Sequence, residues 1–380
     1  MRIVRGSMAA AVLLAAMAAA VPGAQADRAP AGTPSARFSA ARPGTPGRLT
    51  PLQRRAMHGA LPSDPAALRA QKAAAAANLA GGPLASPARR PARSPNPTIH
   101  ASWQGIAADG TSSPSDSTGA IGPSSYIENV NSIATIYDRT GAPLATSGLN
   151  AWWNEGGANA FDPQVMWDAT TGRFYYAGDA VFSGSDNRLA FGFSTTANPT
   201  SLTGADWCRY EVAYGSLFPD YPKLGDSRDF TLIGVNVFSG NSFARSEIVA
   251  ISKPGAGATC PAANTFKSAV GGPLFAHGLQ QFTPVPANEI DSNGTGYVIT
   301  RSGGLPGTTI GVFTVTKAGD GSPIIDTTGA SVAVPSYGVP ASAPQKGTPD
   351  TLPPTRGSRR RSLPSIPSMG TSFVSGHNTP

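Results

Sequence analysis

Cysteine, histidine and long apolar runs are scarce in this sequence of 380 residues, and each shortage excludes a class of protein. The two cysteines and four histidines form neither a paired-cysteine nor a His-Glu-x-x-His zinc motif. No Gly-x-Ser-x-Gly nucleophile elbow occurs either. After residue 26, no run approaches the roughly 20 apolar residues that span a bilayer as a helix. We therefore expect no zinc centre, no serine-hydrolase elbow and no membrane span.

The first 26 residues have the pattern of a signal peptide. Arg2 and Arg5 supply a positive start, residues 8–21 form a short apolar segment, and Ala24-Gln25-Ala26 is an A-x-A cleavage site. Cleavage near Ala26 predicts a secreted protein that is extracellular or associated with the cell wall.

Export also decides how the two cysteines are interpreted. Outside the cell an even pair usually forms a disulfide, which predicts a Cys208–Cys260 bridge. Two free buried thiols are the alternative.

Charge is divided by region, and the division says more than the net charge of +7. Residues 27–98 carry eleven Lys and Arg against two Asp and Glu, and residues 341–380 carry five against one. Residues 99–340 carry eleven against nineteen and are therefore acidic. A nucleic-acid binder concentrates basic charge on its folded surface, so no nucleic-acid partner is expected. The basic flanks are either solvated tails or contacts to anionic cell-envelope polymers.

Composition divides the mature chain into three parts. Residues 27–98 are rich in Ala, Pro, Arg, Ser and Gly and are predicted to be a disordered linker with one possible helix at 65–80. Residues 99–342 alternate strand-like apolar runs with Gly, Pro, Asp and Ser turns, which indicates an all-β domain. Residues 343–380 are predicted to be a partial blade or a disordered basic tail.

A charged turn followed by an apolar strand recurs about every 58 residues. These units begin at Asp162, at Asp220 and near Leu279. Fixed repeats of short strands predict a β-propeller of about four blades plus part of a fifth, with a sandwich as the alternative.

The same residues resemble secreted bacterial β-propeller proteins loosely related to the sialidase-like, or BNR-repeat, superfamily. The resemblance covers roughly residues 100–350 and implies the fold and export more than an activity. Its most specific parts are the DPxV motif at Asp162-Pro163-Gln164-Val165 and the DYPKLG motif at residues 220–225. The Asp-box of true sialidases does not occur, so no catalytic residue is implied by the resemblance. After Leu352 the chain becomes rich in Pro, Ser and Arg, which suggests an incomplete propeller.

Aspartates at the strand entries are the main candidates for chemistry. Asp162 and Asp220 are predicted to occupy equivalent positions in adjacent blades and to face the central channel. Carboxylates placed there could catalyse glycoside hydrolysis or bind Ca²⁺ as a metal site. The alternative is that each carboxylate accepts hydrogen bonds from turn amides and braces its blade.

Aromatic and charged residues beside these aspartates form the predicted ligand-binding set. Trp152-Trp153 is an adjacent pair in an Asn/Gly-rich loop, which suits sugar stacking or packing on the rim. Lys223 is expected to form an ion pair with Asp220 above the Tyr221 ring. The remaining members of the set are Asp168 and Arg173.

These patterns favour a secreted, non-catalytic propeller that binds an extracellular glycan or protein. A sialidase-like extracellular glycoside hydrolase is the alternative, and a truncated copy without function is a second one. Thus an enzyme is not the preferred interpretation, and Ca²⁺ is the one cofactor considered.

Overall fold

The computed structural model describes residues 37–58, 101–107, 115–202, 204–255, 257, 259–290, 293–304, 306–338, 343–344 and 351–352. The predicted signal peptide and the predicted helix at 65–80 lie outside these residues. Among the described residues, no helix is long and apolar enough to cross a membrane.

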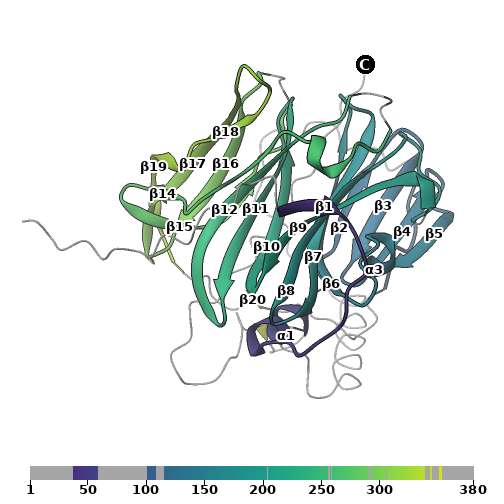
Figure 1. Cartoon of the computed structure of the whole chain (residues 1–380), viewed down its shortest axis with the longest axis horizontal. Helices are drawn as coiled ribbons and strands as arrows, with labels where there is room; N and C mark the ends of the chain where they lie inside the picture. Colours follow the sequence, from purple (N-terminus) through teal and green to yellow (C-terminus); the bar gives the residue numbers. More distant parts are fainter. Residues whose placement is uncertain are drawn as a thin grey trace, which may run out of the picture. The chain divides into compact units, whose positions relative to one another are not determined.

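The described chain folds as four consecutive, mainly antiparallel sheets that pack face to face (Figure 1). In the first three sheets, strands that follow one another in sequence pair as a meander, because short turns join neighbouring antiparallel strands. The fourth sheet departs from this order, because its first strand, Phe275–Ala276, also pairs in parallel with its last, Thr328–Tyr337. This is the architecture of a β-propeller, and the predicted fold class is confirmed.

We number the sheets as blades one to four. Blade one consists of β2 (Thr118–Ile121), β3 (Ser125–Val130), β4 (Ile133–Asp138) and β5 (Pro143–Gly148), followed by α3 (Leu149–Trp152). Blade two consists of β6 (Asn159–Asp168), β7 (Arg173–Ser183), β8 (Asp186–Ser194) and β9 (Trp207–Gly215), the last preceded by a short 3-10 helix, η2 (Gly204–Asp206).

Blade three consists of β10 (Leu217–Asp226), β11 (Phe230–Ser239), β12 (Ser242–Ser252) and β13 (Ser268–Gly271), with η3 (Ala263–Thr265) before the last strand. Blade four contains β14 (Phe275–Ala276), β15 (Leu279–Pro286), β16 (Gly296–Ser302), β17 (Gly307–Lys317), β18 (Pro323–Ile325) and β19 (Thr328–Tyr337). Beyond it, β20 (Ala343–Pro344) pairs with β21 (Thr351–Leu352).

Apolar cores fill the spaces between successive blades. The core between blades two and three is built from alternate residues of β7, β8, β11 and β12, including Tyr175, Phe191, Val235 and Val249. Strands β7 and β11 are buried along nearly their whole length, because each lies inside its sheet and neighbouring blades pack on both faces of that sheet. Burial on both faces is what makes these strands continuous apolar runs in the sequence.

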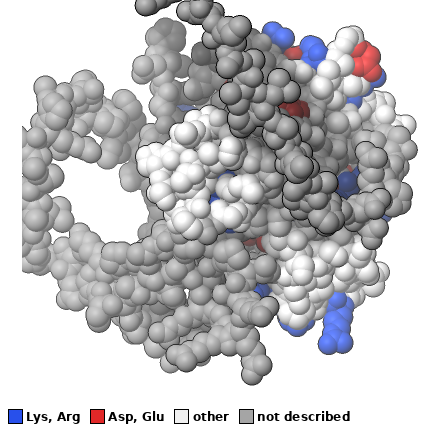
Figure 2. Space-filling view, turned by 90° about the vertical axis from the view of Figure 1, so that its left-hand side faces the viewer, with Lys and Arg blue, Asp and Glu red and all other residues white. Residues whose placement is uncertain are grey.

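The described residues cover blade four on one face only. Along β16, Val298 and Thr300 are buried while Tyr297 and Ile299 are each more than two-fifths exposed. The view onto this side of the molecule shows a described surface with few charged side chains (Figure 2). Strand alternation therefore leaves an apolar outer face on this blade.

The predicted disulfide is present. Cys208 and Cys260 are bonded with a Cα–Cα distance of 5.2 Å. The bridge joins β9 of blade two to the segment between β12 and β13 of blade three. It therefore crosses a blade junction as well as closing a loop.

Residues 37–58 depart from the predicted disordered linker, because they are folded against the propeller. Strand β1 (Phe38–Ala40) pairs with β9 and adds a fifth strand to blade two. Helix α1 (Pro51–His58) follows, and Leu52 and Met57 pack on an apolar cluster that includes Phe161 and Phe282. Composition alone did not indicate this, because it depends on two tertiary contacts. Phe38 packs into an apolar core, and the β1 backbone pairs with the free edge of β9.

Candidate functional site

Three blades each have a β-bulge in one strand: β6 in blade two, β10 in blade three and β15 in blade four. At each bulge the residue before a proline has a left-handed backbone: Asp162 with φ 51°, Tyr221 with φ 61° and Thr283 with φ 56°. The strand register shifts at each of these points. A non-glycine residue with positive φ is uncommon, so its recurrence in three blades shows that the bulge is a regular part of the repeat.

The bulges correct one sequence prediction. Asp162 is equivalent to Tyr221, whereas Asp220 is equivalent to Phe161, one position earlier. Asp162 and Asp220 are thus not equivalent positions of adjacent blades. Their side chains nevertheless point toward the same space. This is possible because a bulge changes the direction in which the side chains of its strand point.

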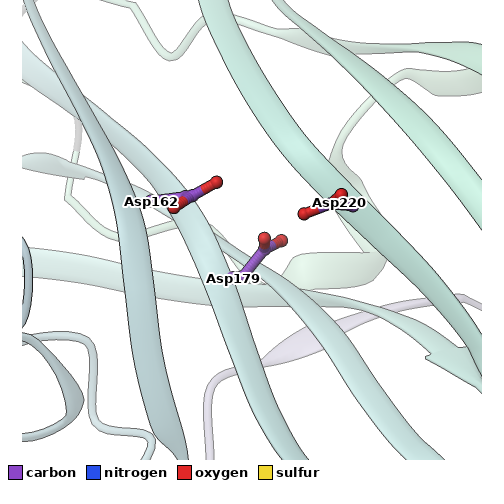
Figure 3. Close-up of side chains that lie close together, drawn as sticks. All are labelled: Asp162, Asp179 and Asp220. Carbon is purple, nitrogen blue, oxygen red and sulfur yellow. The ribbon is translucent and has the colours of Figure 1, made fainter. Parts of the chain in front are cut away.

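The structure adds a third carboxylate, Asp179, to the two predicted aspartates. Asp162 comes from β6, Asp179 from the neighbouring strand β7, and Asp220 from β10 of the next blade (Figure 3). One oxygen from each carboxylate lies within 4.8 Å of the others. We call Asp162, Asp179 and Asp220 the carboxylate trio.

Burial differs across the trio. Asp179 is completely buried, Asp162 is 8% exposed, and Asp220 is partly exposed. Asp220 is therefore the least buried member of the trio. Removing ionised carboxylates from water is unfavourable unless they are paired or neutralised.

Electrostatics within the trio follow from this burial. Burial raises the pKa of Asp162 well above its ordinary value, and the charges of Asp116 and Asp220 raise it further. Burial and the charges of Asp162 and Asp220 likewise raise the pKa of Asp179. Burial raises the pKa of Asp220 to about 7, against the opposing effect of Lys223. The trio thus holds protons more tightly than surface carboxylates do.

Lys223 lies beside the trio without the predicted ion pair. Its Nζ donates a hydrogen bond to the Pro222 carbonyl at 3.2 Å and sits 3.5 Å from the centroid of the Tyr221 ring. Among the described residues, no carboxylate oxygen lies within the 4.0 Å of an ion pair with it. Burial lowers the pKa of Lys223, while the nearby aspartates oppose that shift. The sequence placed Lys223 and Tyr221 together correctly, but their contact is a cation–π interaction.

A hydrogen-bonded brace joins neighbouring blades on either side of the trio. The side-chain Oδ1 of Asn131 accepts the backbone N–H of Asp162 at 3.0 Å. The Oδ1 of Asn236 accepts the backbone N–H of Thr283 at 2.8 Å. Each N–H belongs to a left-handed residue at a bulge. An amide side chain from one blade thus binds the first strand of the next.

Asp179 occupies the corresponding place at the junction of blades two and three. It pairs across the sheet with Phe161, as Asn236 pairs with Asp220. The backbone N–H of Tyr221 is near enough to lower the pKa of Asp179. Neither carboxylate oxygen, however, has a hydrogen-bond partner of acceptable geometry among the described residues. A buried carboxylate with unused acceptors therefore points into the trio (Figure 3).

Gly234 shows how closely the blades approach at these bulges. A Cβ at this position would collide with the carbonyl oxygen of Pro284 in the next blade. Glycine is required there because two backbones pack directly against each other.

Two predicted ligand-binding residues lie elsewhere. Asp168 forms a buried ion pair with Lys253 at 3.0 Å, and Lys253 also pairs with Asp226 at 2.7 Å. Arg173 is 1% exposed, donates to the Ser194 carbonyl at 2.7 Å and lies over the Phe193 ring. These residues tie strands and blades together at the opposite ends of β6 and β7, away from the trio.

The tryptophan pair also differs from its predicted role. Trp152 and Trp153 are both completely buried, and Trp153 stacks on Tyr176 with an interplanar angle of 4°. Helix α3 makes this possible, because its turn directs both rings inward where a strand would send them to opposite faces. They belong to the core between blades one and two and offer no surface to a soluble glycan.

Sequence reasoning missed Asp179, and it also missed Asp116, whose Oδ2 accepts a hydrogen bond from the Asn131 Nδ2 at 3.1 Å and whose charge raises the pKa of Asp162. Asp179 stands in a long apolar strand, RFYYAGDAVFS, and a lone carboxylate in such a run was the available signal. A charged residue inside a doubly buried strand needs a partner or a function.

The trio is the place where the described residues could hold a metal. Carboxylate oxygens are the donors that hard cations such as Ca²⁺ take. The three oxygens lie within 4.8 Å of one another, which is no farther than the about 4.6–5.2 Å that separates ligands on opposite sides of one Ca²⁺.

No protein-family model and no curated protein matches this chain. Among solved structures, a GH43_1 enzyme from Xanthomonas citri matches with a TM-score of 0.32 and 9% identity over 58% of this chain and 73% of that one. An α-L-arabinanase from Cellvibrio cellulosa matches with a TM-score of 0.29 and 11% identity over 57% and 76% of the two chains. An exo-β-1,3-galactanase from Phanerochaete chrysosporium matches with a TM-score of 0.29 and 7% identity over 53% of this chain.

The present chain spans about half the length of the galactanase, since 47% of that protein is covered. Structural similarity at these TM-scores and identities does not indicate an activity for this chain. The link to sialidase-like propellers and the export of the protein remain predictions.

Proposed function

We propose that this protein is an extracellular glycoside hydrolase, the alternative that the sequence offered. The observation that supports it is the convergence of three carboxylates from two adjacent blades. Glycoside hydrolysis requires two carboxyl groups at the scissile bond, about 5–5.5 Å apart when the anomeric configuration is retained. One oxygen of each carboxylate in the trio lies within 4.8 Å of the others, which fits this shorter spacing better than the roughly 6.5–9.5 Å of inverting enzymes. A retaining reaction is therefore the proposed chemistry.

The trio suggests a division of roles. Asp220 is the partly exposed member, so it is proposed as the acid that protonates the leaving oxygen and later activates water. Asp162 is proposed as the group that attacks the anomeric carbon, and it does so only in its ionised form, which its raised pKa makes the less populated one. Asp179 lies buried between them and is proposed to position and polarise the pair.

A panel of aryl glycosides and polysaccharides, offered to the mature chain, tests this function. The wild-type protein should hydrolyse at least one substrate with retention of configuration. Asp220→Asn should lower kcat by about 10²-fold or more, since positioned proton transfer contributes about that much. Asp320→Asn is the matched control, because Asp320 is an exposed turn carboxylate of blade four.

Two results would contradict the proposal. Hydrolysis that survives Asp220→Asn unchanged would place the reaction elsewhere. Retention of a glycan on an array without turnover of any substrate would favour the non-catalytic binding protein instead.

A further inference from the structure

The carboxylate trio has no ion-pair partner within the part of the chain that the structure describes. Lys223 is the nearest basic side chain that affects all three pKa values, yet its ammonium group contacts the Tyr221 ring and the Pro222 carbonyl. Among the described residues, none forms an ion pair with Asp162, Asp179 or Asp220. By contrast, the buried carboxylates Asp168 and Asp226 are both paired with Lys253.

Asp179 provides an independent sign that something is bound. It is completely buried, both of its oxygens lack a hydrogen-bond partner among the described residues, and it points into the trio (Figure 3). The brace at the next blade junction shows that an asparagine can occupy this position. Asp179 thus places a carboxylate where, in the next blade, Asn236 satisfies the neighbouring backbone without adding charge.

We propose that the oxygens of Asp162, Asp179 and Asp220 bind one divalent cation of the size and hardness of Ca²⁺. The cation supplies the positive charge that the described residues do not bring into contact with the trio. Three carboxylates provide part of the six to eight oxygens that Ca²⁺ takes, and water completes the shell on the partly exposed Asp220 side.

The cation also regulates the proposed reaction, and this consequence alone rests on the proposed function. A bound cation occupies the carboxylate oxygens that would otherwise meet the sugar. Calcium should therefore inhibit hydrolysis, and a chelator should increase it. Binding of the cation itself does not depend on any hydrolytic activity.

Titration calorimetry and thermal unfolding with CaCl₂ test the site, with NaCl at equal ionic strength as the salt control. The mature wild-type chain should bind one Ca²⁺ and show a saturable rise in Tm that a chelator reverses. Asp179→Asn should weaken Ca²⁺ binding at least about tenfold. Asp320→Asn should bind as the wild type does.

The Tm of the Asp179→Asn variant shows whether any loss of calcium binding results from unfolding. Asparagine at this position can accept the Tyr221 N–H as Asn236 accepts that of Thr283, so the variant should have a higher Tm than the calcium-free wild type. Asp220→Asn, on a partly exposed strand, is the second variant and should also lose calcium binding.

Each outcome supports or overturns the site. No calcium binding by the wild type, or equal binding by Asp179→Asn, would overturn it. Calcium binding without hydrolysis would leave the cation site standing and reject the hydrolase. Hydrolysis without calcium binding would support the hydrolase and reject the cation site.

Discussion

Asp179 and Asn236 occupy equivalent places on the second strands of adjacent blades, but only Asn236 binds the next blade through its side chain. Asn236 accepts the Thr283 N–H and the Ser246 hydroxyl, at 2.8 Å and 2.9 Å, and its Nδ2 donates to the Thr283 hydroxyl at 3.3 Å. Asp179 makes no comparable contact among the described residues. One repeat position thus serves stability in one blade and is available for chemistry in another.

Replacing Asn236 by aspartate should destabilise the protein. The change removes the Nδ2 donor and places a negative charge at a position with no exposed surface. The expected loss is about 1–3 kcal/mol in the free energy of unfolding, measured by urea titration. Asn293→Asp is the control, because this exposed turn side chain acts as an acceptor, which aspartate also provides. Equal stability of Asn236→Asp and the wild type would show that the brace contributes nothing.

Glu155 should make stability depend on pH. It is completely buried beside Arg188, which also pairs with Glu211, and Asp186 contacts the same guanidinium. Burial, followed by the charge of Glu211, raises the pKa of Glu155 to about 9 despite Arg188.

The direction follows from proton linkage. The unfolded chain releases the Glu155 proton near pH 4.5, whereas the folded protein retains it up to about pH 9. Stability should therefore decrease as pH rises through this interval and level off above it. Glu155→Gln should show a smaller decrease in Tm between pH 5 and pH 9. Identical pH profiles for the two proteins would disprove this assignment.

The Cys208–Cys260 bridge should account for a large share of the stability of blades two and three. It spans 52 residues, so loss of the constraint on the unfolded chain costs on the order of 4 kcal/mol in the chain-entropy model. The double variant Cys208→Ser, Cys260→Ser should unfold at lower urea than the wild type, and dithiothreitol should shift only the wild type. The Tyr210 hydroxyl, which donates to the Pro261 carbonyl at 2.8 Å, should keep the segment in place in the variant. A reductant that leaves the wild-type midpoint unchanged would contradict this prediction.

Trp153 should behave as a core residue. Truncation to alanine removes a fully buried ring stacked on Tyr176 and in contact with Gly178, and should cost about 3–5 kcal/mol. Trp153→Phe retains part of the stacking and should lose less. Thermal unfolding measures both. A Trp153→Ala protein that melts like the wild type but loses glycan retention would restore the ligand-binding interpretation.

Much of the architecture could be predicted from local patterns. Apolar strand runs separated by Gly, Pro and Asp turns indicated an all-β chain, and their recurrence indicated blades. The cysteine count together with the signal pattern predicted the disulfide. These features depend on neighbouring residues and on fixed periods, which are visible in the sequence.

The N-terminal segment could not be predicted in the same way. The composition of residues 27–98 suggested a disordered linker, yet β1 pairs with β9, more than 160 residues away in the chain. Such pairing depends on a free sheet edge that exists only after blade two has formed. Gln53 likewise finds its partners, Ser183 and Asn187, only in the folded protein.

By itself, the sequence determined the strand-and-turn repeat, the acidic strand entries and the pairing of two lone cysteines. Only the tertiary structure decided which carboxylates meet. Sequence spacing matched Asp162 with Asp220, whereas the left-handed residue at each bulge matches Asp162 with Tyr221. Asp179 joins them from a neighbouring strand through packing between blades. The trio arises because side-chain direction at a bulge and the distance between blades are set by the folded backbone, and neither is encoded in a local run of residues.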